Sequence, residues 1–451
     1  MIRTPPTTPS RGLRRDVCAA GAAVLLVTAS VLAGRHIEDT SHTLFVDWPP
    51  LLASWGPHLG PGTPAAVLVA VATVAYGPVL TARLPWRALL PAAWGTAMVW
   101  ILSLALVDGW HRGIARRLTT RHEYLRVIDR FDDIPAALRG FTGHILLDSP
   151  DNWPAHVAGH PPAATLTFVL LDRIGLRGGG WAGMWCITVG ATACVAVLVA
   201  IRALADEALA RRAAPFLVLA PAAVWMGTSA DAYFAAVVAW AVALSALAVT
   251  RRSPGWAGAA GLLLGLTCYL SYGLTLVALI AAAALVLGRR GGRERPVPVV
   301  ALLAGLAVVP TVFTLAGFDW WEAYRLLVTR YGEGAGGIRP YAYWVWADLA
   351  CAVLITGLAT AAGLRRTVAV LVRHRTGPRA DLRLACLVCA ALAALLVADL
   401  SGMSKAETER IWLPFALWLL PACAFLTRPR LWLTAQALLA LLLNHLLYTG
   451  W

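Results

Sequence analysis

The sequence predicts an all-α polytopic membrane protein, and three observations support that fold class. Of the 451 residues, 59% are hydrophobic and only 14% are charged, whereas soluble domains carry about 25% charged residues. The hydrophobic residues fall into runs that approach the roughly 20 residues a helix needs to cross a bilayer. The arginines gather in the short segments between those runs, which is typical of cytoplasmic loops. The net charge of +14 therefore reflects membrane topology, and nucleic acid is not expected as a partner.

The chain begins with a basic segment, residues 1–16, that we expect to remain in the cytoplasm. No convincing cleavage site follows the first apolar run, so the sequence favours an uncleaved anchor over a removed signal peptide. About thirteen crossing helices are predicted. They cover 17–34, 64–82, 87–107, 181–201, 213–230, 231–250, 256–271, 273–288, 297–317, 342–364, 384–400, 411–427 and 431–449.

The apolar segment 161–177 is predicted not to cross, because the charges of the later loops decide its placement. If it crossed, the arginine-rich segments 251–252, 289–295, 365–383 and 428–430 would all lie outside, against the bias of short loops. We therefore expect a membrane-surface helix that starts at a double proline. The resulting topology has the N-terminus inside and the C-terminus outside, in the plasma (inner) membrane.

The segment 108–160 is the long polar loop of the chain, and this topology places it outside the cell. Apolar spacing within it predicts amphipathic helices that lie along the membrane surface. Asp108 ends the third crossing helix at the lipid–water boundary, where a low dielectric strengthens a carboxylate as a general base. An ordinary helix-ending Asp is the alternative. Glu123 is a candidate substrate contact, with a solvated charge as its alternative.

His156 and His160 are four residues apart, a spacing that suits a metal only if the segment is helical. Pro161 and Pro162 follow directly and argue against a regular helix. We therefore favour a turn that presents an imidazole to a phosphate or an acceptor, and we assign no metal ligands. All eight cysteines fall within apolar runs, so no disulfide framework or cysteine metal site is expected.

Two further clusters of charge are predicted to face outward. Asp231, between two apolar runs, suggests an acid that faces a cavity, with a helix N-cap as the alternative. The segment 404–410 contains the single lysine, and its basic residues suit a phosphate while its acidic residues would orient them. An interfacial salt-bridged helix cap is the alternative for that segment. Its candidate residues are Lys405, Glu407, Glu409 and Arg410.

Aromatic residues mark a third outward region, the loop 318–341. Its tryptophans, tyrosines, glycines and arginines suit stacking on a sugar ring, whereas an aromatic belt at the membrane interface is the alternative. Arg339 and Tyr341 in this loop, and Tyr272 in an earlier outward turn, are candidate substrate contacts.

The order of these parts resembles the GT-C superfamily of membrane glycosyltransferases, close to protein O-mannosyltransferases and lipid A aminoarabinose transferases. The motifs of the actinobacterial type are GHPP at 159–162, LSYGL at 270–274, RPYAYW at 339–344 and ETERIWLPF at 407–415. The resemblance covers about 87–430. It implies that 17–86 is an N-terminal two-helix addition and 431–451 a C-terminal transmembrane helix.

The resemblance implies transfer of a sugar from a polyprenyl-phosphate donor to an envelope glycan, lipid or protein. Asp108 would act as the base of an inverting displacement, with His160 near the lipid phosphate and Asp231 near the carrier. Arg410 and Lys405 would contact the phosphate. The family often has Asp-Glu at the catalytic turn, but this chain has Asp108-Gly109.

Two other classes remain open on the sequence alone. A transporter or flippase would show internal repeats and ionisable residues at mid-membrane, neither of which is prominent here. A non-catalytic scaffold of envelope assembly is the second alternative, because of the Asp-Gly departure. The sequence identifies no cofactor and leaves a divalent cation, Mg²⁺ or Mn²⁺, as the candidate. Membrane lipid, the donor and the acceptor are the expected partners.

Overall fold

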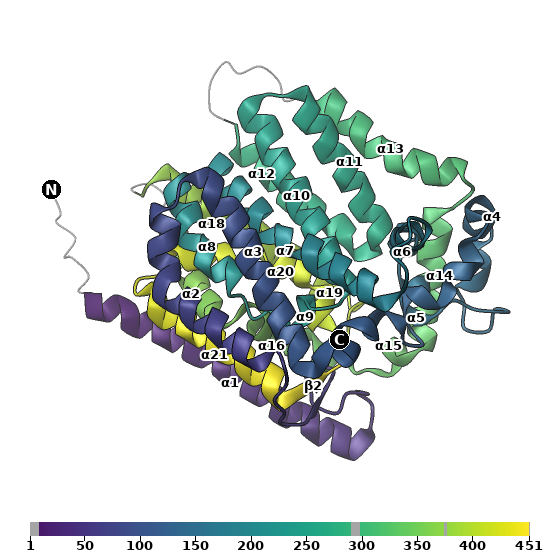
Figure 1. Cartoon of the computed structure of the whole chain (residues 1–451), viewed down its shortest axis with the longest axis horizontal. Coiled ribbons are helices and arrows are strands. Elements are labelled where there is room, and N and C mark those ends of the chain that lie inside the picture. Colours follow the sequence, from purple (N-terminus) through teal and green to yellow (C-terminus); the bar gives the residue numbers. More distant parts are fainter. Residues whose placement is uncertain (1–8, 290–297, 374–376, 451) are drawn as a thin grey trace.

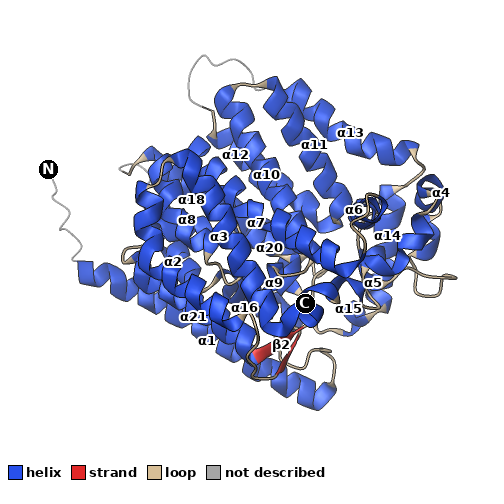
Figure 2. Ribbon diagram, viewed as in Figure 1, coloured by secondary structure: helices blue, strands red, loops and turns tan. Residues whose placement is uncertain are grey.

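The computed structural model describes residues 9–289, 298–373 and 377–450, and most of this chain is helical (Figures 1 and 2). This confirms the all-α polytopic class. Six helices of the described chain are long and apolar enough to cross a membrane. They are α1 Pro9–Ser41, α2 Thr63–Arg83, α3 Trp86–Ala105, α7 Gly178–Leu204, α10 Ala230–Arg251 and α18 Arg379–Leu400.

The predicted cytoplasmic tail, residues 1–16, is only partly a tail. Its first eight residues lie outside the described chain, but from Pro9 onward it forms the first turns of α1. Asp16 is completely buried, and both of its carboxylate oxygens bind arginines of a later helix, Arg365 and Arg366. The long helix α1 runs diagonally along one edge of the molecule (Figure 1). It packs against two later helices, over 341–356 and 358–372.

Two further pairs of helices have the length and apolarity of a span but are sharply bent. The first pair is α13 Val299–Leu315 with α14 Trp320–Glu333, bent by 77°, and the second is α16 Tyr341–Thr356 with α17 Leu358–Val372, bent by 105°. Counting each pair as one span gives eight. The predicted crossing helix over 342–364 is therefore not continuous but is broken at Gly357.

Gly357 explains the bend between α16 and α17. Its φ of 83° is one that residues with a side chain rarely adopt, and a Cβ there would lie 1.8 Å from Oε1 of Gln436. Gln436 Nε2 donates to Thr356 O at 2.7 Å, while its Oε1 accepts from Ala359 N at 3.3 Å. One buried amide thus satisfies backbone groups on both sides of the break.

Continuous helices over 213–230 and 411–427 are also absent, and the predicted count of thirteen spans is not confirmed. Prolines interrupt both runs: Pro221 follows the first helix of one, while Pro414 and Pro421 divide the other. The pieces are α8 Glu207–Val218, α9 Ala223–Met226, α19 Thr408–Ile411, α20 Leu413–Ala416 and the turn η7 Leu420–Phe425.

The remaining apolar helices are shorter. A helix of 11 residues starts directly after the double proline and is too short to cross a bilayer. Together these helices and turns are α6 Ala163–Arg173, α11 Pro254–Leu270, η6 Tyr272–Leu276, α12 Val277–Leu287, α15 Ala335–Ile338 and α21 Pro429–Leu446. Of these, α11 and α12 pack on α10, while α21 packs on α2 and α17.

The loop 108–160 is a folded cap of short helical pieces, and its buried aromatic residues belong to the main core of the molecule. Phe131, Phe141 and Trp153 are fully buried, and the Trp153 indole donates to Phe141 O at 2.9 Å. Arg330 of α14 donates to Trp153 O and joins the cap to that helix. The pieces are η1 Leu106–Asp108, η2 His111–Ala115, η3 Arg117–Thr119, η4 Tyr124–Phe131, α4 Ile134–Arg139, η5 Phe141–His144 and α5 Ala155–Gly159.

The structure contains a two-stranded antiparallel sheet, which the sequence did not predict. This sheet places the C-terminal segment beside polar residues of the loop 108–160. β1 Ala53–Trp55 pairs with β2 Leu447–Thr449, with Ala53 opposite Thr449. The predicted helix 431–449 therefore ends at Leu446 and continues as a strand (Figure 2). This strand supplies one wall of the site described next.

Candidate functional site

A polar pocket forms where the cap, the start of α10, α19 and the end of β2 meet. Its lining residues surround about 280 Å³ of space between protein atoms, part of which is open to solvent. Four residues predicted from the sequence line it, namely Glu123, His156, Asp231 and Arg410. The complete lining is Arg117, Glu123, Tyr124, His156, Thr228, Ser229, Ala230, Asp231, Arg410 and Gly450.

Arg410 is the centre of the pocket. Its guanidinium is 5% exposed, donates to Asp231 Oδ2 at 2.6 Å, and donates to Glu407 Oε2 and His156 Nε2 at 2.9 Å each. Burial lowers the pKa of Arg410, but the charges of Asp231 and Glu407 outweigh burial and raise it above the usual value. Arg410 therefore stays charged and holds together three elements that lie far apart in the sequence.

The backbone before Arg410 is unusual. Ala406 and Glu407 have φ values of 67° and 62°, a left-handed conformation that is uncommon for residues other than glycine. This double turn starts α19 and directs the Glu407 carboxylate back to the guanidinium of Arg410. Such conformations often occur at functional sites, where the surrounding structure imposes them.

His156 connects Arg410 to Glu123. Because Arg410 donates to Nε2, the proton of the neutral imidazole lies on Nδ1, which donates to Glu123 Oε1 at 2.9 Å. Among the described residues, the buried Oε2 of Glu123 and Oγ of Ser229 have no hydrogen-bond partner. These two pocket residues thus offer a fixed carboxylate oxygen and a hydroxyl to a ligand.

Asp108 lies beside the pocket but does not line it. Its Oδ1 is 2.9 Å from His58 Nε2, and its Oδ2 is 2.8 Å from Arg117 Nη2 and 3.4 Å from Arg112 Nε. Only Arg117 of these partners lines the pocket. Both carboxylate oxygens of Asp108 are thus occupied by basic side chains and are not directed into the pocket.

His160 is placed for packing more than for anion binding. Its Nδ1 donates to His156 O at 2.7 Å and lies 3.1 Å from the Tyr124 hydroxyl. Burial lowers the pKa of His160 to about 4, against a smaller opposing effect of Asp231. The imidazole is therefore neutral at pH 7 and brings no charge to a phosphate.

Lys405, Arg339 and Tyr341 do not join the pocket. Lys405 Nζ donates to Gly336 O at 2.8 Å, and Arg339 donates to Lys405 O at 2.8 Å. The Tyr341 hydroxyl donates to Leu400 O at 3.1 Å. The contacts of Lys405 and Arg339 join the segment around α15 to the segment just before α19.

Glu409 and Tyr272 also lie elsewhere. Glu409 is fully buried, and its Oε1 accepts from Leu52 N at 3.1 Å. Tyr272 packs among aromatic rings, 5.1 Å from Trp320 and 5.6 Å from Tyr324 between centroids. The sequence grouped Glu409 and Tyr272 with the other candidates because all were predicted on the same side of the membrane. Residues on one side of a membrane need not touch one another.

Asp231 is not the N-cap that the sequence offered as its alternative role. Ser229 is the N-cap of α10, and its side chain makes no capping hydrogen bond. Asp231 lies in the first turn, where a negative charge is favoured by the helix dipole, and its carboxylate binds Arg410.

The divalent cation left open by the sequence finds no matching ligand group in the described residues. Nowhere among them do three or more His, Cys, Asp or Glu side chains gather closely enough to hold a metal ion. The pocket carboxylates already have nitrogen partners, because Asp231 and Glu407 bind Arg410 and Glu123 binds His156. The Arg410 guanidinium thus lies between the Asp231 and Glu407 carboxylates, where a metal ion would otherwise bind.

Sequence reasoning missed Arg117, Ser229 and the C-terminal strand. Arg117 follows Asp108 by nine residues in the same polar loop, and Ser229 immediately precedes the helix that carries Asp231, so proximity in sequence was an available signal. Thr449 accepts from Arg117 Nη1 at 3.0 Å through its carbonyl. A backbone carbonyl leaves no such signal, because any residue provides one.

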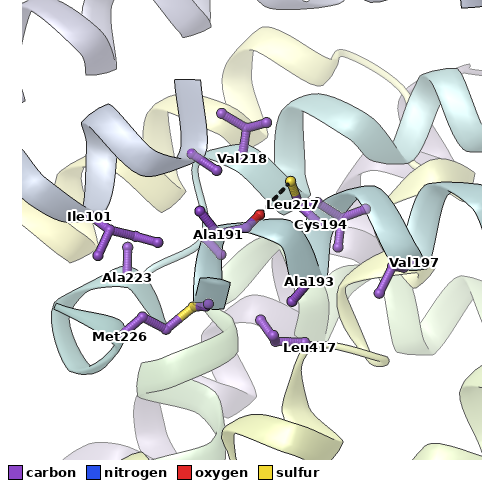
Figure 3. A pocket seen from close by; sticks show the side chains of 13 residues that line it. Ile101, Ala191, Ala193, Cys194, Val197, Leu217, Val218, Ala223, Met226 and Leu417 are labelled. Atoms are coloured by element: carbon purple, nitrogen blue, oxygen red, sulfur yellow. Dashed lines mark hydrogen bonds between the residues drawn. The ribbon is translucent and has the colours of Figure 1, made fainter. Parts of the chain in front are cut away.

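A second pocket is apolar and lies deeper in the bundle, between α3, α7, α8 and α9 (Figure 3). Ile101, Val218 and Met226 line it, and the Cys194 thiol near its wall donates to Ala191 O at 3.1 Å. Met226 of this pocket and Thr228 of the polar pocket are two residues apart. The short segment after α9 thus separates an apolar cavity from a charged one.

No protein-family model and no curated protein matches this chain. Among solved structures it is similar to the Archaeoglobus fulgidus oligosaccharyltransferase in its apo form, at 13% identity and a TM-score of 0.43, over 81% of this chain and 50% of that one. The same oligosaccharyltransferase in complex with Zn and sulfate is 14% identical, with a TM-score of 0.35, over 76% of this chain and 53% of that one. Tethered to an acceptor peptide with the NVT sequon, it is 12% identical, with a TM-score of 0.40, over 74% of this chain and 49% of that one.

The chain thus spans about half the length of these structures. All three TM-scores are below 0.5.

Proposed function

We propose that this protein transfers a sugar from a polyprenyl-phosphate donor to an envelope glycan, lipid or protein on the outer face of the plasma membrane. The observation that supports this most directly is the buried chain of contacts Glu123–His156–Arg410–Asp231 around one pocket. Buried charges are costly unless paired, and here they surround a pocket at the end of apolar helices. Such an arrangement suits a substrate with a polar, anionic head and a lipid tail.

The reaction would be a single inverting displacement. The acceptor hydroxyl oxygen attacks the anomeric carbon, the bond from that carbon to the phosphate oxygen breaks, and polyprenyl phosphate leaves with the bonding electrons. The hydroxyl proton passes to a carboxylate. Binding acceptor and donor in one fixed geometry supplies much of the rate, and guanidinium groups stabilise the charge that develops on the phosphate.

Two carboxylates are candidates for the base. Asp108 has the position that the family resemblance assigns to it, yet it binds Arg117, Arg112 and His58. Glu123 lines the pocket, and its buried Oε2 has no hydrogen-bond partner in the described chain. Geometry therefore favours Glu123 for the proton, with Asp108 in an electrostatic role.

The test is sugar transfer in membranes that contain the full chain, supplied with radiolabelled polyprenyl-phosphate sugars. Glu123→Gln should reduce the maximal rate by about 10²–10⁴-fold, the usual contribution of a general base, with little change in donor KM. Asp148→Asn, in the same cap but exposed, is the matched control and should retain full activity.

The comparison with Asp108→Asn distinguishes the two bases. A larger rate loss for Asp108→Asn than for Glu123→Gln, with both proteins folded, would return the base role to Asp108. Absence of turnover with every donor tested would reject the enzyme and favour the alternatives, a transporter or flippase, or a scaffold of envelope assembly. Net movement of labelled lipid across the membrane without sugar transfer would identify the first of these.

A further inference from the structure

We propose that Arg117 is the side chain that binds the phosphate of the lipid-linked donor, and that Asp108 and the C-terminal strand hold it in position. The inference rests on the proposed function and specifies which residue recognises the anion. It replaces the roles that the sequence suggested for His160, Lys405 and Arg410, each of which the structure engages in other contacts.

The charge around Arg410 is unfavourable for a phosphate. Its single positive charge is shared by the carboxylates of Asp231, at 2.6 Å, and Glu407, at 2.9 Å. One cation between two anions leaves a net negative charge, so an approaching phosphate would be repelled at close range. The role of Arg410 is therefore to hold His156, Asp231 and Glu407 in place through hydrogen bonds.

The charge at the other end of the pocket has the opposite sign. There one carboxylate, Asp108, meets two guanidinium groups, Arg112 and Arg117, as well as His58. Arg117 is the member that lines the pocket, and its side chain is only 12% exposed. One anion among two or more basic groups leaves an excess of positive charge that an anionic ligand would neutralise.

Two properties of Arg117 itself agree with an unsatisfied cation. Nη2 donates to Asp108 and Nη1 donates to Thr449 O, but the buried Nε has no partner in the described chain. Burial, with a smaller contribution from Arg112, lowers the pKa of Arg117 to about 10 despite the opposing effect of Asp108. A bound phosphate would accept from Nε and restore part of the lost stabilisation, as charge-assisted pairs of arginine and phosphate do.

The C-terminal strand fixes the direction of this guanidinium. β2 pairs with β1, and Gly450 N donates to Leu52 O at 3.0 Å, which brings Gly450 to the pocket wall. The Tyr448 ring stacks on His58 at 4.2 Å and lies under the Arg112 guanidinium at 3.9 Å. The strand thus secures the residues around Asp108 while the Thr449 carbonyl binds Arg117 directly.

The experiment measures binding of farnesyl phosphate to the purified full chain in detergent, with farnesol as the uncharged probe. Arg117→Gln should weaken farnesyl phosphate about 10–100-fold, the range for loss of a charged hydrogen bond, and leave farnesol unchanged. Arg117→Lys keeps the charge and should lose less. Arg116→Gln removes an equal charge from the exposed neighbour and should bind both probes as the wild type does.

Tyr448→Ala tests the positioning role of the strand. It should weaken farnesyl phosphate binding in the wild type but add nothing in the Arg117→Gln background, because both changes act through one guanidinium. Thermal unfolding of each variant shows whether it is folded. If Arg117→Lys is folded and Arg117→Gln is not, the affinity of the lysine variant for farnesyl phosphate is compared with that of the wild type. Weaker binding by the lysine variant supports the inference, and equal binding opposes it.

Normal binding of farnesyl phosphate by folded Arg117→Gln would overturn this inference, whatever the protein does with donors. Arg117-dependent binding in a protein that transfers no sugar would leave the inference standing and reject the proposed function. A tenfold loss in Arg410→Gln, with Arg117→Gln unaffected, would return the phosphate to Arg410. The three outcomes therefore separate the two proposals.

Discussion

Gly109 shows how one residue determines the geometry of the site. Its φ of 77° and ψ of 169° lie in a region that is essentially restricted to glycine. This turn follows Asp108 directly and lets the chain reverse, so that Arg112 and Arg117 return to the Asp108 carboxylate. The departure from the Asp-Glu of the resembled family therefore has a structural reason in this chain.

Gly109→Ala should destabilise the protein by about 1–3 kcal/mol, the cost of one residue held in such a conformation. There is open space around this glycine, so strain and not collision is the cause. The measurement is thermal unfolding in detergent. Gly143→Ala, a cap glycine that also has open space but no positive φ, is the control. Equal stability of the two variants would contradict the expectation.

Acid should destabilise the protein through His160. Burial holds the pKa of the folded His160 near 4, below the ordinary value of 6.5. As the pH falls from 6.5 toward 4, the unfolded state therefore binds a proton that the folded state does not, and stability decreases. The expected loss is of order 1–3 kcal/mol. Melting temperatures measured across this range should decrease less in His160→Gln, and parallel curves would refute the assignment.

At the scale of elements, the breaks in helices position the site as much as the helices do. The double left-handed turn at Ala406–Glu407 starts α19 and presents Arg410. The bend at Gly357 turns α17 away from α16, so that α17 carries Arg365 and Arg366 to Asp16 of α1. Apolar runs in the sequence hide these breaks, because hydropathy does not report backbone direction.

Gly357→Ala should destabilise the α16–α17 bend by more than about 2 kcal/mol, since strain at positive φ and a clash with buried Gln436 act together. Gly332→Ala in α14 has open space around it and should raise stability by up to about 1 kcal/mol through helix propensity. Thermal unfolding compares the two. A tolerated Gly357→Ala would mean that Gln436 moves aside.

At the scale of the whole molecule, remote segments converge on one pocket. Arg410 and His156 are separated by 254 positions, and Arg117 and Thr449 by 332. Helix α1, which starts within the predicted cytoplasmic tail, is attached to α17 through Asp16, Arg365 and Arg366. A change in the packing of these helices would therefore disturb the pocket from a distance.

The predicted orientation can be tested by labelling introduced cysteines with a membrane-impermeant maleimide. Asp148→Cys, exposed in the cap, should react in intact cells. Gly377→Cys, exposed in the arginine-rich segment before α18, should react only after permeabilisation, because that segment is predicted to lie inside. The wild-type chain gives the background, including the exposed Cys18. The reverse pattern would invert the topology and place the pocket on the cytoplasmic side.

The sequence predicted the class of fold and several residues of the site for physical reasons that act locally. A bilayer requires long apolar helices, so composition and run length were sufficient for the all-α class. Charged residues within such a chain are costly unless they have partners, which is why Glu123, His156, Asp231 and Arg410 were recognisable as candidates. Helix breaks at Gly357, Pro221 and Pro414 were less visible, because membrane helices also tolerate glycine and proline.

By itself the sequence determined that the protein is a bundle of apolar helices with one long polar loop and a set of charged residues outside the apolar runs. Only the tertiary structure decided which charges meet. Arg410 pairs with Asp231 and Glu407, whereas Asp108 pairs with Arg117, and Lys405 turns away to a backbone carbonyl. The physical reason is that burial can be read from local patterns of residues, but ion pairing depends on distances of a few ångströms between segments that only folding brings together.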